Sequence, residues 1–423
     1  MIVTILAFIP ILLWLNVPSS QSRLAGFSTI LASLGQLFGL VGVVLFSINL
    51  ILSARLRLFD RYLNGLNNVY LKHNQIGQIA LILLLFHPLL LISKYSVNIH
   101  EAALFLWLSD DWAINWGILA LGIMIFLIVI TLYLMPKYNI WKWTHKFLGL
   151  AFFLAALHVW LIPSDVSIYL PLRIYIISLA GLGLAAFLYK SILGRFLIKK
   201  YKYVVTDVKL ANNLVIEIIL RPQTEKITFS PGQFVFLNFK DSRIGLESHP
   251  FSLTSAPTDN EITFLIKNLG DYTKTLNDLT LGTIAEVEGP FGNFSFEKTI
   301  RKSQIWIAGG IGITPFISMA KDLPLDQGYK IDLLYCVRNE NETVKFDLLE
   351  NISAMSNGCF RVILFCSNSS GRITIDSIKN LAGSILEKEI LICAPPAMIQ
   401  SLKKTLTLNG VARKYIHSEE FSF

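Results

Sequence analysis

The stretch KHNQIGQIALILLLFHPLLLI, from Lys72 to Ile92, decides the fold of the first half of the chain. Most of it is apolar enough to lie in lipid, yet it contains His73 and His87, fourteen residues apart. In an α-helix, that spacing leaves two side chains about 40° apart around the axis and about 21 Å apart along it. Imidazoles inside membrane spans are rare and usually functional. The stretch therefore predicts a membrane helix with two functional histidines on one face.

The composition divides the chain into two halves. Its 423 residues are 53% hydrophobic, but long apolar runs dominate only up to about Tyr189, and a soluble pattern begins after Tyr201. A spanning helix needs roughly 20 mostly apolar residues. The first of six candidate runs is also short enough for the core of a signal peptide, but no basic residue precedes it and no clear cleavage site follows, which favours a retained span. The six candidates are about Ile2–Leu15, Phe27–Ser53, Ile76–Ile92, Ala113–Met135, Phe147–Ile162 and Leu170–Leu188.

The charge pattern predicts the orientation of these spans. Lysine and arginine gather in the connections on one side, whereas the other side is slightly acidic, and basic connections mark the cytoplasmic side of a membrane. The soluble half is therefore expected in the cytoplasm. The net charge of +8 follows from these anchors and does not indicate a nucleic-acid partner. All four cysteines lie in the second half without paired metal spacing, which indicates reduced thiols.

A second histidine pair lies in the fifth candidate span. His145 and His158 are thirteen residues apart, which places them about 140° apart in an ideal helix. A locally wider turn, or ligands that approach from different sides, would resolve this mismatch. Because the third and fifth spans run in the same direction, His73 and His145 should share one depth, and His87 and His158 the other.

Each pair could bind one iron as the two axial ligands of a haem. The alternatives are hydrogen bonds between helices and a proton path. The matched depths, and the absence of Asp and Glu from the six candidate runs, favour two haems.

The second half of the sequence changes pattern near Ile305. Short alternating strands such as VIEIIL and QFVFLNF come first and predict an antiparallel barrel. QIWIAGGIGITPFISMA then begins a strand–helix alternation typical of a parallel α/β sheet. Gly309, Gly310 and Gly312 would let the backbone approach a phosphate at the start of a helix, although Pro315 replaces the last glycine of the usual motif. A plain tight turn is the alternative.

These motifs resemble a known superfamily. HPFSLTSAP, GDYTKTL, GPFG, AGGIGITPF, CAPPAM and the final SEEFSF are similar to the flavin and nicotinamide loops of ferredoxin-reductase-type flavoproteins. Joined to six spans with two histidine pairs, they resemble the NADPH oxidase and ferric reductase superfamily, and bacterial members in particular. The resemblance implies a transmembrane di-haem domain in 1–195, an FAD-binding barrel in 200–298 and an NAD(P)H-binding α/β domain in 299–423.

The resemblance also implies roles for single residues. Ser252 would lie near the reactive flavin nitrogen, Cys393 beside the nicotinamide, and Phe421 or Phe423 would shield the flavin. Arg338 and Arg372 would bind the 2′-phosphate of NADPH, which favours NADPH, but Asn368 stands where a second arginine is expected, so NADH stays open. The remaining cofactor contacts would come from His249, Pro250, Phe251, Lys267, Gly270, Thr273, Gly309, Gly310, Gly312, Thr314 and Pro315.

The expected reaction is transmembrane electron transfer. Electrons would pass from cytosolic NAD(P)H to FAD, then to two b-type haems held by His73 with His145 and His87 with His158, and then to an extracytoplasmic acceptor. The resemblance favours oxygen as the acceptor and superoxide as the product. Arg23 would supply a positive charge that stabilises this anion. Leu91 stands where animal oxidases carry another histidine, which leaves this oxygen pocket open to question. The alternatives are reduction of a ferric chelate or of a periplasmic protein. The expected location is a bacterial plasma membrane, with no obligate protein partner.

Overall fold

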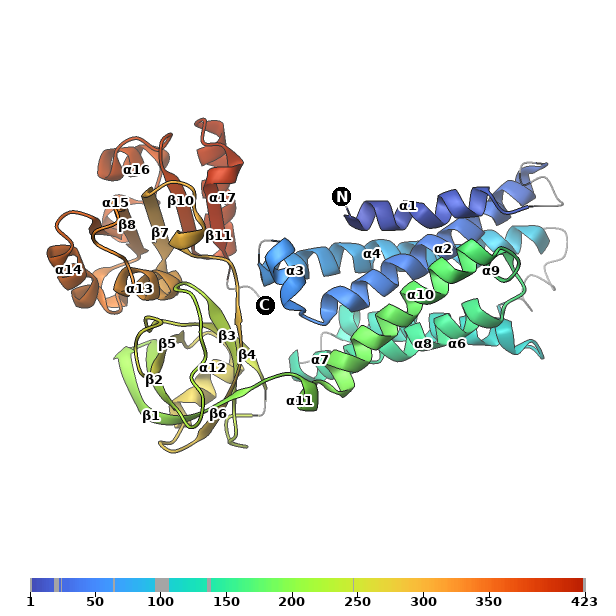
Figure 1. Ribbon diagram of the computed structural model, residues 1–423, viewed down its shortest axis with the longest axis horizontal. Coiled ribbons are helices and arrows are strands. Elements are labelled where there is room, and N and C mark those ends of the chain that lie inside the picture. Colours follow the sequence, from blue (N-terminus) through green and yellow to red (C-terminus); the bar gives the residue numbers. More distant parts are fainter. Residues whose placement is uncertain are drawn as a thin grey trace. The chain divides into compact units, whose positions relative to one another are not determined.

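A computed structural model describes residues 2–18, 23, 25–63, 65–95, 106–134, 138–245 and 247–420. It divides into two compact units. The first contains Met1–Phe59 and Asn68–Ile198, and the second contains Lys199–Phe423 together with the short segment Asp60–Asn67. Figure 1 shows that the first unit is helical and that the second carries the strands.

The first unit is built of apolar helices. Within the described residues, five segments are long and apolar enough to cross a membrane, whereas α1 has only 14 residues, so six spans are not established. The helices are α1 (Ile2–Leu15), α2 (Phe27–Ser53), α3 (Arg57–Tyr62), α4 (Leu66–Leu91), α6 (Trp112–Val129), α7 (Tyr138–His145), α8 (Leu148–Leu161), α9 (Asp165–Ile168), α10 (Leu170–Phe187) and α11 (Gly194–Leu197), with η1 (Ile92–Tyr95) and the π-turns η2 (Ile130–Leu134) and η3 (Leu188–Ile192).

The turn between α7 and α8 lessens the spacing problem of the second histidine pair. The N–H groups of Lys146 and Phe147 donate to carbonyls three residues earlier, at 3.2 and 3.0 Å. Such a turn rotates the chain by about 120° per residue instead of 100°, which reduces the mismatch of about 140°. Of the two alternatives that the sequence left open, a locally wider turn is wrong, because the chain tightens here, and ligands that approach from different sides stay a prediction.

The second unit begins with a six-stranded antiparallel sheet in the order β4-β3-β6-β1-β2-β5. Its inward side chains, such as Tyr203, Val205 and Ile218, form a buried core of their own. The strands and short helices are β1 (Tyr201–Asn212), β2 (Val215–Pro222), β3 (Phe234–Phe239), β4 (His249–Ser252), β5 (Ile262–Lys267), α12 (Asp271–Thr275), η4 (Leu276–Asp278), β6 (Ile284–Phe291) and η5 (Phe296–Lys298).

A five-stranded parallel sheet follows, in the order β11-β10-β7-β8-β9. Alternate residues of β7 face opposite cores: Trp306 packs with α13 and α14, and Ile307 with α16 and α17. Helices on both faces explain why the strands read as continuous apolar runs. The elements are β7 (Ser303–Gly309), η6 (Gly310–Ile313), α13 (Thr314–Lys321), β8 (Lys330–Val337), η7 (Glu340–Glu342), α14 (Phe346–Met355), β9 (Phe360–Cys366), α15 (Ser367–Ser370), α16 (Ile375–Ala382), β10 (Glu389–Cys393), α17 (Pro396–Leu408), η8 (Arg413–Tyr415) and β11 (Ile416–Glu419).

Candidate redox site

The structure brings His73 and His145 together. Their ring centroids lie 6.3 Å apart, with an interplanar angle of 65°. Nδ1 of His73 is 3.1 Å from the backbone carbonyl oxygen of Asn49 in α2. A carbonyl can only accept a hydrogen bond, so it places the proton on Nδ1 and leaves the Nε2 lone pair available. This matches the shared depth that the sequence predicts for these two residues.

The second pair is held in the same way. Nδ1 of His87 is 2.7 Å from the carbonyl oxygen of Gly35, and Nδ1 of His158 is 2.7 Å from that of Ala113. Both rings therefore have their tautomers set by main-chain oxygens of a neighbouring helix.

Two glycines make room for these rings. A Cβ atom at Gly39 would lie 2.6 Å from Nδ1 of His87, and one at Gly117 would lie 2.9 Å from Nδ1 of His158. Each glycine comes four residues after the carbonyl that binds the same imidazole, at Gly35 and Ala113 respectively. A carbonyl and a glycine four residues later therefore hold His87 against α2 and His158 against α6. Sequence reasoning missed both glycines, although their spacing in apolar helices is a known signal of close packing.

The histidine pairs fit a haem better than a multi-ligand metal site. An ion held by two imidazoles on opposite sides, at metal–nitrogen distances of about 2 Å, separates the ring centroids by about 6 Å. The 6.3 Å between His73 and His145 agrees with this spacing. Within the described ranges, no group of three or more His, Cys, Asp and Glu side chains could hold a metal ion. The role of the four histidines as ligands stays a prediction.

The candidate flavin strand lies at the edge of the antiparallel sheet. In β4, His249 pairs with Leu237 and Ser252 pairs with Phe234 on β3. The ring of His249 stacks on Tyr272, with centroids 3.8 Å apart, and its Nε2 lies 2.8 Å from a carboxylate oxygen of Glu247. Pro250 and Phe251 are half-buried, whereas Ser252 is buried. The strand is thus anchored at its first residue and carries a buried hydroxyl at its last.

Unsatisfied polar atoms near α12 fit an absent cofactor. The Tyr272 hydroxyl and the Asn268 side-chain carbonyl are buried and have no hydrogen-bond partner within the described part of the chain. The Thr273 hydroxyl instead accepts from the N–H groups of Leu269 and Gly270, both at 2.9 Å. Buried polar groups normally have partners, so the two orphaned oxygens fit a bound polar ligand. Sequence reasoning missed Tyr272, which lies within the motif GDYTKTL.

The three glycines at and after the end of β7 have different roles. A Cβ at Gly312 would lie 2.0 Å from the carbonyl oxygen of Cys393, and one at Gly309 would lie 2.7 Å from Cβ of Ala394. These two therefore permit close packing of the β7 and β10 loops. Gly310 has φ +56° and nothing within 4 Å of the Cβ position. Gly310 is the one that leaves open space at the edge of the sheet, where a phosphate would bind.

The residues after these glycines begin α13. Thr314 is its first residue, and its hydroxyl donates to the carbonyl of Ile311 at 3.1 Å. Pro315 occupies the first turn, where a missing N–H is tolerated. The helix therefore starts directly at the glycine turn, as the sequence predicts.

Two buried acidic groups meet at the ends of β10 and β11. Burial raises the pKa of the Cys393 thiol well above its ordinary value, and the nearby Glu419 charge adds to this. Burial also raises the pKa of Glu419 to about 8, with a further contribution from Asp60. Cys393 is thus a neutral thiol, and Glu419 can hold a proton near neutral pH. Phe421 and Phe423 lie outside the described residues.

The candidate arginines are placed differently. Arg338 Nε lies 2.8 Å from a carboxylate oxygen of Glu342, whereas Arg372 is exposed. Arg23 lies 3.2 Å from Asp165, and its guanidinium stacks 3.9 Å from the ring centroid of Trp14. The charge of Arg23 is thus partly neutralised by an ion pair, a partner that the sequence did not reveal.

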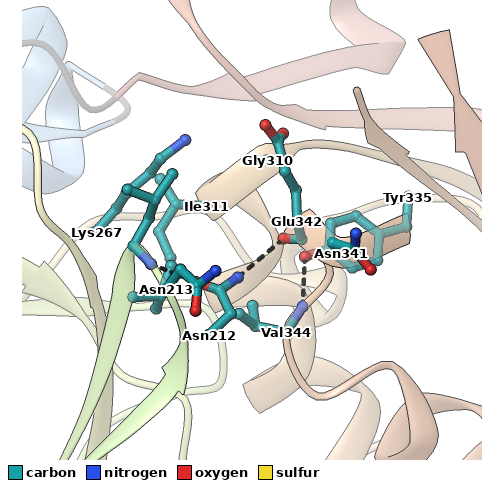
Figure 2. A pocket seen from close by; sticks show the side chains of 11 residues that line it. Asn212, Asn213, Lys267, Gly310, Ile311, Tyr335, Asn341, Glu342 and Val344 are labelled. Carbon is teal, nitrogen blue, oxygen red and sulfur yellow. Dashed lines mark hydrogen bonds between the residues drawn. The ribbon is translucent and has the colours of Figure 1, made fainter. Parts of the chain in front are cut away.

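A pocket with a volume of about 140 Å³ lies between the two sheets of the second unit (Figure 2). Its lining combines the β1–β2 turn with the loops after β7 and β8. Lys267 and Glu342 are the oppositely charged side chains at its rim. The remaining lining residues are Asn212, Asn213, Leu214, Val215, Gly310, Ile311, Tyr335, Asn341 and Val344.

Three family descriptions match successive parts of the chain. Residues 38–156 match "Ferric reductase like transmembrane component", residues 200–313 match "FAD-binding domain", and residues 306–404 match "Oxidoreductase NAD-binding domain". Together they place a transmembrane component ahead of a flavin and nicotinamide module. The chain belongs to the NADPH oxidase and ferric reductase superfamily. It therefore combines a membrane component with an FAD-binding and an NAD-binding domain.

Individual relatives cover parts of this superfamily member. The ferredoxin reductase component of 3-ketosteroid-9-alpha-monooxygenase from Mycobacterium tuberculosis is 26% identical over 46% of this chain and 56% of its own length. NADPH oxidase 4 of Rattus norvegicus is 32% identical over 31% of this chain and 26% of its own length. The chain thus spans about half or less of these two proteins.

One solved structure has a similar fold over most of the chain. A flavohemoglobin from Malassezia yamatoensis aligns with a TM-score of 0.52 at 16% identity and covers 93% of this chain and 96% of its own. This likeness concerns the fold alone. It agrees with helices followed by an antiparallel flavin domain and an α/β nucleotide domain.

Proposed function

We propose that this protein is a transmembrane NAD(P)H oxidase. It would take electrons from NAD(P)H on the cytoplasmic side and reduce oxygen to superoxide on the other side. The two histidine pairs are the observation that supports this most, because hydrogen bonds between helices alone would not require two imidazoles to face each other, as His73 and His145 do at 6.3 Å. The flavin and nicotinamide domains alone would equally suit a soluble reductase.

Two b-type haems would lie inside the helical unit. His73 and His145 would hold one, and His87 and His158 the other. Haem iron accepts and releases single electrons, which shortens each electron transfer across a low-dielectric interior. The residues of this chain hold the protons on Nδ1 through the carbonyls of Asn49, Gly35 and Ala113, at 3.1, 2.7 and 2.7 Å.

FAD would connect the two-electron donor NAD(P)H to the haems, which carry one electron each. A flavin accepts a hydride and then releases single electrons, whereas a nicotinamide transfers electrons only as hydride. Ser252, the last residue of β4, offers a buried hydroxyl to the ring. The neutral Cys393 thiol packs at the end of β10, and Glu419, whose pKa is raised by burial, can supply or accept a proton. Lys267, Gly270 and Thr273 would contact the diphosphate, and Phe421 or Phe423 would cover the ring.

The membrane orientation follows from charge. Basic residues collect in the connections that would face the cytoplasm of a bacterial plasma membrane, together with the dehydrogenase half. On the other side, Arg23 would favour an anionic product, although its ion pair with Asp165 weakens that effect.

Ferric-chelate reduction is the second candidate. The match of residues 38–156 to a ferric-reductase-like component favours it, whereas the relative named NADPH oxidase 4 favours oxygen. Either acceptor would receive electrons on the outer side, from the haem that His87 and His158 would hold.

An absorption spectrum of the purified full-length protein tests the proposal. Under anaerobic conditions, NADH or NADPH should produce low-spin b-type bands, and haem analysis should give about two haems per chain. His87→Ala and His73→Ala should each lose one haem, whereas His100→Ala, outside both pairs, should keep both. Retained flavin without haem bands would contradict the histidine assignment.

The acceptor is tested separately. After air is admitted, cytochrome c reduction that superoxide dismutase suppresses would identify oxygen as the acceptor. Ferrous iron formed from a ferric chelate under nitrogen, at a higher rate than superoxide forms in air, would favour the second candidate instead.

A further inference from the structure

The ion pair between Arg338 and Glu342 lies at the edge of the nucleotide pocket. Arg338 directly follows β8, and Glu342 ends the short turn η7. The two oxygens of Glu342 contact Arg338 twice: one lies 2.8 Å from Nε, and the other accepts from the backbone N–H at 3.4 Å. Arg338 is therefore held by its own neighbour at both its side chain and its main chain.

Glu342 also lines the pocket itself. Figure 2 shows its carboxylate extending along the wall that includes Gly310 and Tyr335, on the same side as the Lys267 ammonium. Among the side chains that line the pocket, Glu342 is the only carboxylate. A ligand that enters at Gly310 and extends toward the end of β8 would meet this negative charge.

The second arginine expected from the sequence is missing at this point. Asn368 occupies the place, and its N–H donates to the carbonyl of Arg338 at 3.0 Å. Arg372 is four residues farther along the chain and exposed. The end of β8 thus carries one arginine whose charge is paired, next to a carboxylate.

The chemistry of the adenosine ribose makes this arrangement selective. In parallel α/β nucleotide sites, a carboxylate accepts from the ribose 2′-hydroxyl of NADH, whereas a free arginine binds the 2′-phosphate of NADPH. A phosphate dianion beside Glu342 would be repelled, and it would compete with Glu342 for Arg338. A 2′-hydroxyl would instead donate to the carboxylate without breaking the ion pair.

We propose that Glu342 determines the nucleotide preference and directs this enzyme toward NADH. This rests on the proposed function, since it assigns the electron donor of the same site. It also reverses the preference for NADPH that the arginines alone suggested in the sequence.

Anaerobic flavin reduction in the full-length protein loaded with FAD tests this directly, because the reaction needs neither haem nor acceptor. The wild type should show a higher kcat/KM for NADH than for NADPH. Glu342→Gln should shift the ratio toward NADPH by about tenfold, as expected for one charge near a partly exposed phosphate. Glu350→Gln, an exposed acid in α14, is the matched control and should leave the ratio unchanged.

Inhibition of the wild type provides a second measurement that requires no variant to fold. 5′-AMP should compete with NADH at least as strongly as 2′,5′-ADP, which differs by the 2′-phosphate alone. Tighter inhibition by 2′,5′-ADP, or an equal effect of Glu342→Gln on both nucleotides, would overturn the assignment. Flavin that neither nucleotide reduces would refute the proposed function as well, whereas missing haem would leave this inference intact.

Discussion

Replacing Gly39 by alanine should remove the haem proposed for His87 and His158 and leave the other proposed haem in place. The new Cβ would lie 2.6 Å from Nδ1 and 2.7 Å from Cε1 of His87. Ordinary van der Waals contact begins near 3.4 Å, so the ring must shift by roughly 0.8 Å. The ring cannot shift freely, because its Nδ1 is bound to the carbonyl of Gly35 at 2.7 Å.

The expected cost follows from this overpacking. Inserting a methyl group into a tightly packed site costs about 1–3 kcal/mol. Applied to ligand binding, this corresponds to a loss of roughly 5- to 150-fold in haem affinity at that site. The variant should therefore purify with about one haem per chain, and its low-spin electron paramagnetic resonance signal should lose one component.

Two glycine variants provide the control. A Cβ at Gly122 or Gly181 would have nothing within 4 Å, although both residues lie in long apolar helices. Gly122→Ala and Gly181→Ala should therefore keep both haems. If Gly39→Ala retains two haems with unchanged spectra, the close contact between Gly39 and the His87 ring has no role in haem ligation. Equal losses in all three variants would show that the effect is general destabilisation.

Two further predictions concern the second unit. Burial, aided by the charge of Asp60, raises the pKa of Glu419 from 4.5 to about 8, so the folded state binds a proton more tightly there than the unfolded state. Stability should thus fall as pH rises from about 4.5 to 8, by at most about 5 kcal/mol, and denaturant titrations of Glu419→Gln should lack this part of the pH dependence. Gly312→Ala should lower the melting temperature and release flavin, because its Cβ would lie 2.0 Å from the Cys393 carbonyl oxygen. Gly310→Ala, which clashes with nothing, should cost only about 1 kcal/mol for its φ of +56°, measured by the same melting curves. Equal melting temperatures for the two variants would contradict the division of roles between these glycines.

The sequence predicted those features that depend on local periodicity. Apolar runs identified the long helices, and the common direction of the third and fifth spans placed His73 beside His145. The alternating strands and the change of pattern near Ile305 distinguished the antiparallel sheet from the parallel one. These inferences succeed because each depends on residues close together in the chain.

Features that depend on contacts between distant residues were missed. The tight turn at Lys146 and Phe147 contains neither Gly nor Pro, so no turn residue marks it in the sequence. The ion pair of Arg23 joins it to Asp165, 142 residues away. The pairing of Arg338 with Glu342 is local, but motif comparison assigns arginines by position and not by the charge of their neighbours.

The acceptors for the histidine Nδ1 atoms are main-chain oxygens. Gly35 and Asn49 are fourteen residues apart on α2, and their partners His87 and His73 are fourteen apart on α4. Amino-acid substitution cannot delete a backbone carbonyl, so these hydrogen bonds should survive point mutations that leave α2 in register and place no atom against the rings, as Gly39→Ala would. A single-residue insertion between Gly35 and Asn49 would instead turn one carbonyl away by about 100°. Selection on this site should therefore tolerate side-chain changes in α2 that keep clear of the rings, unlike Gly39→Ala, and reject changes in its length.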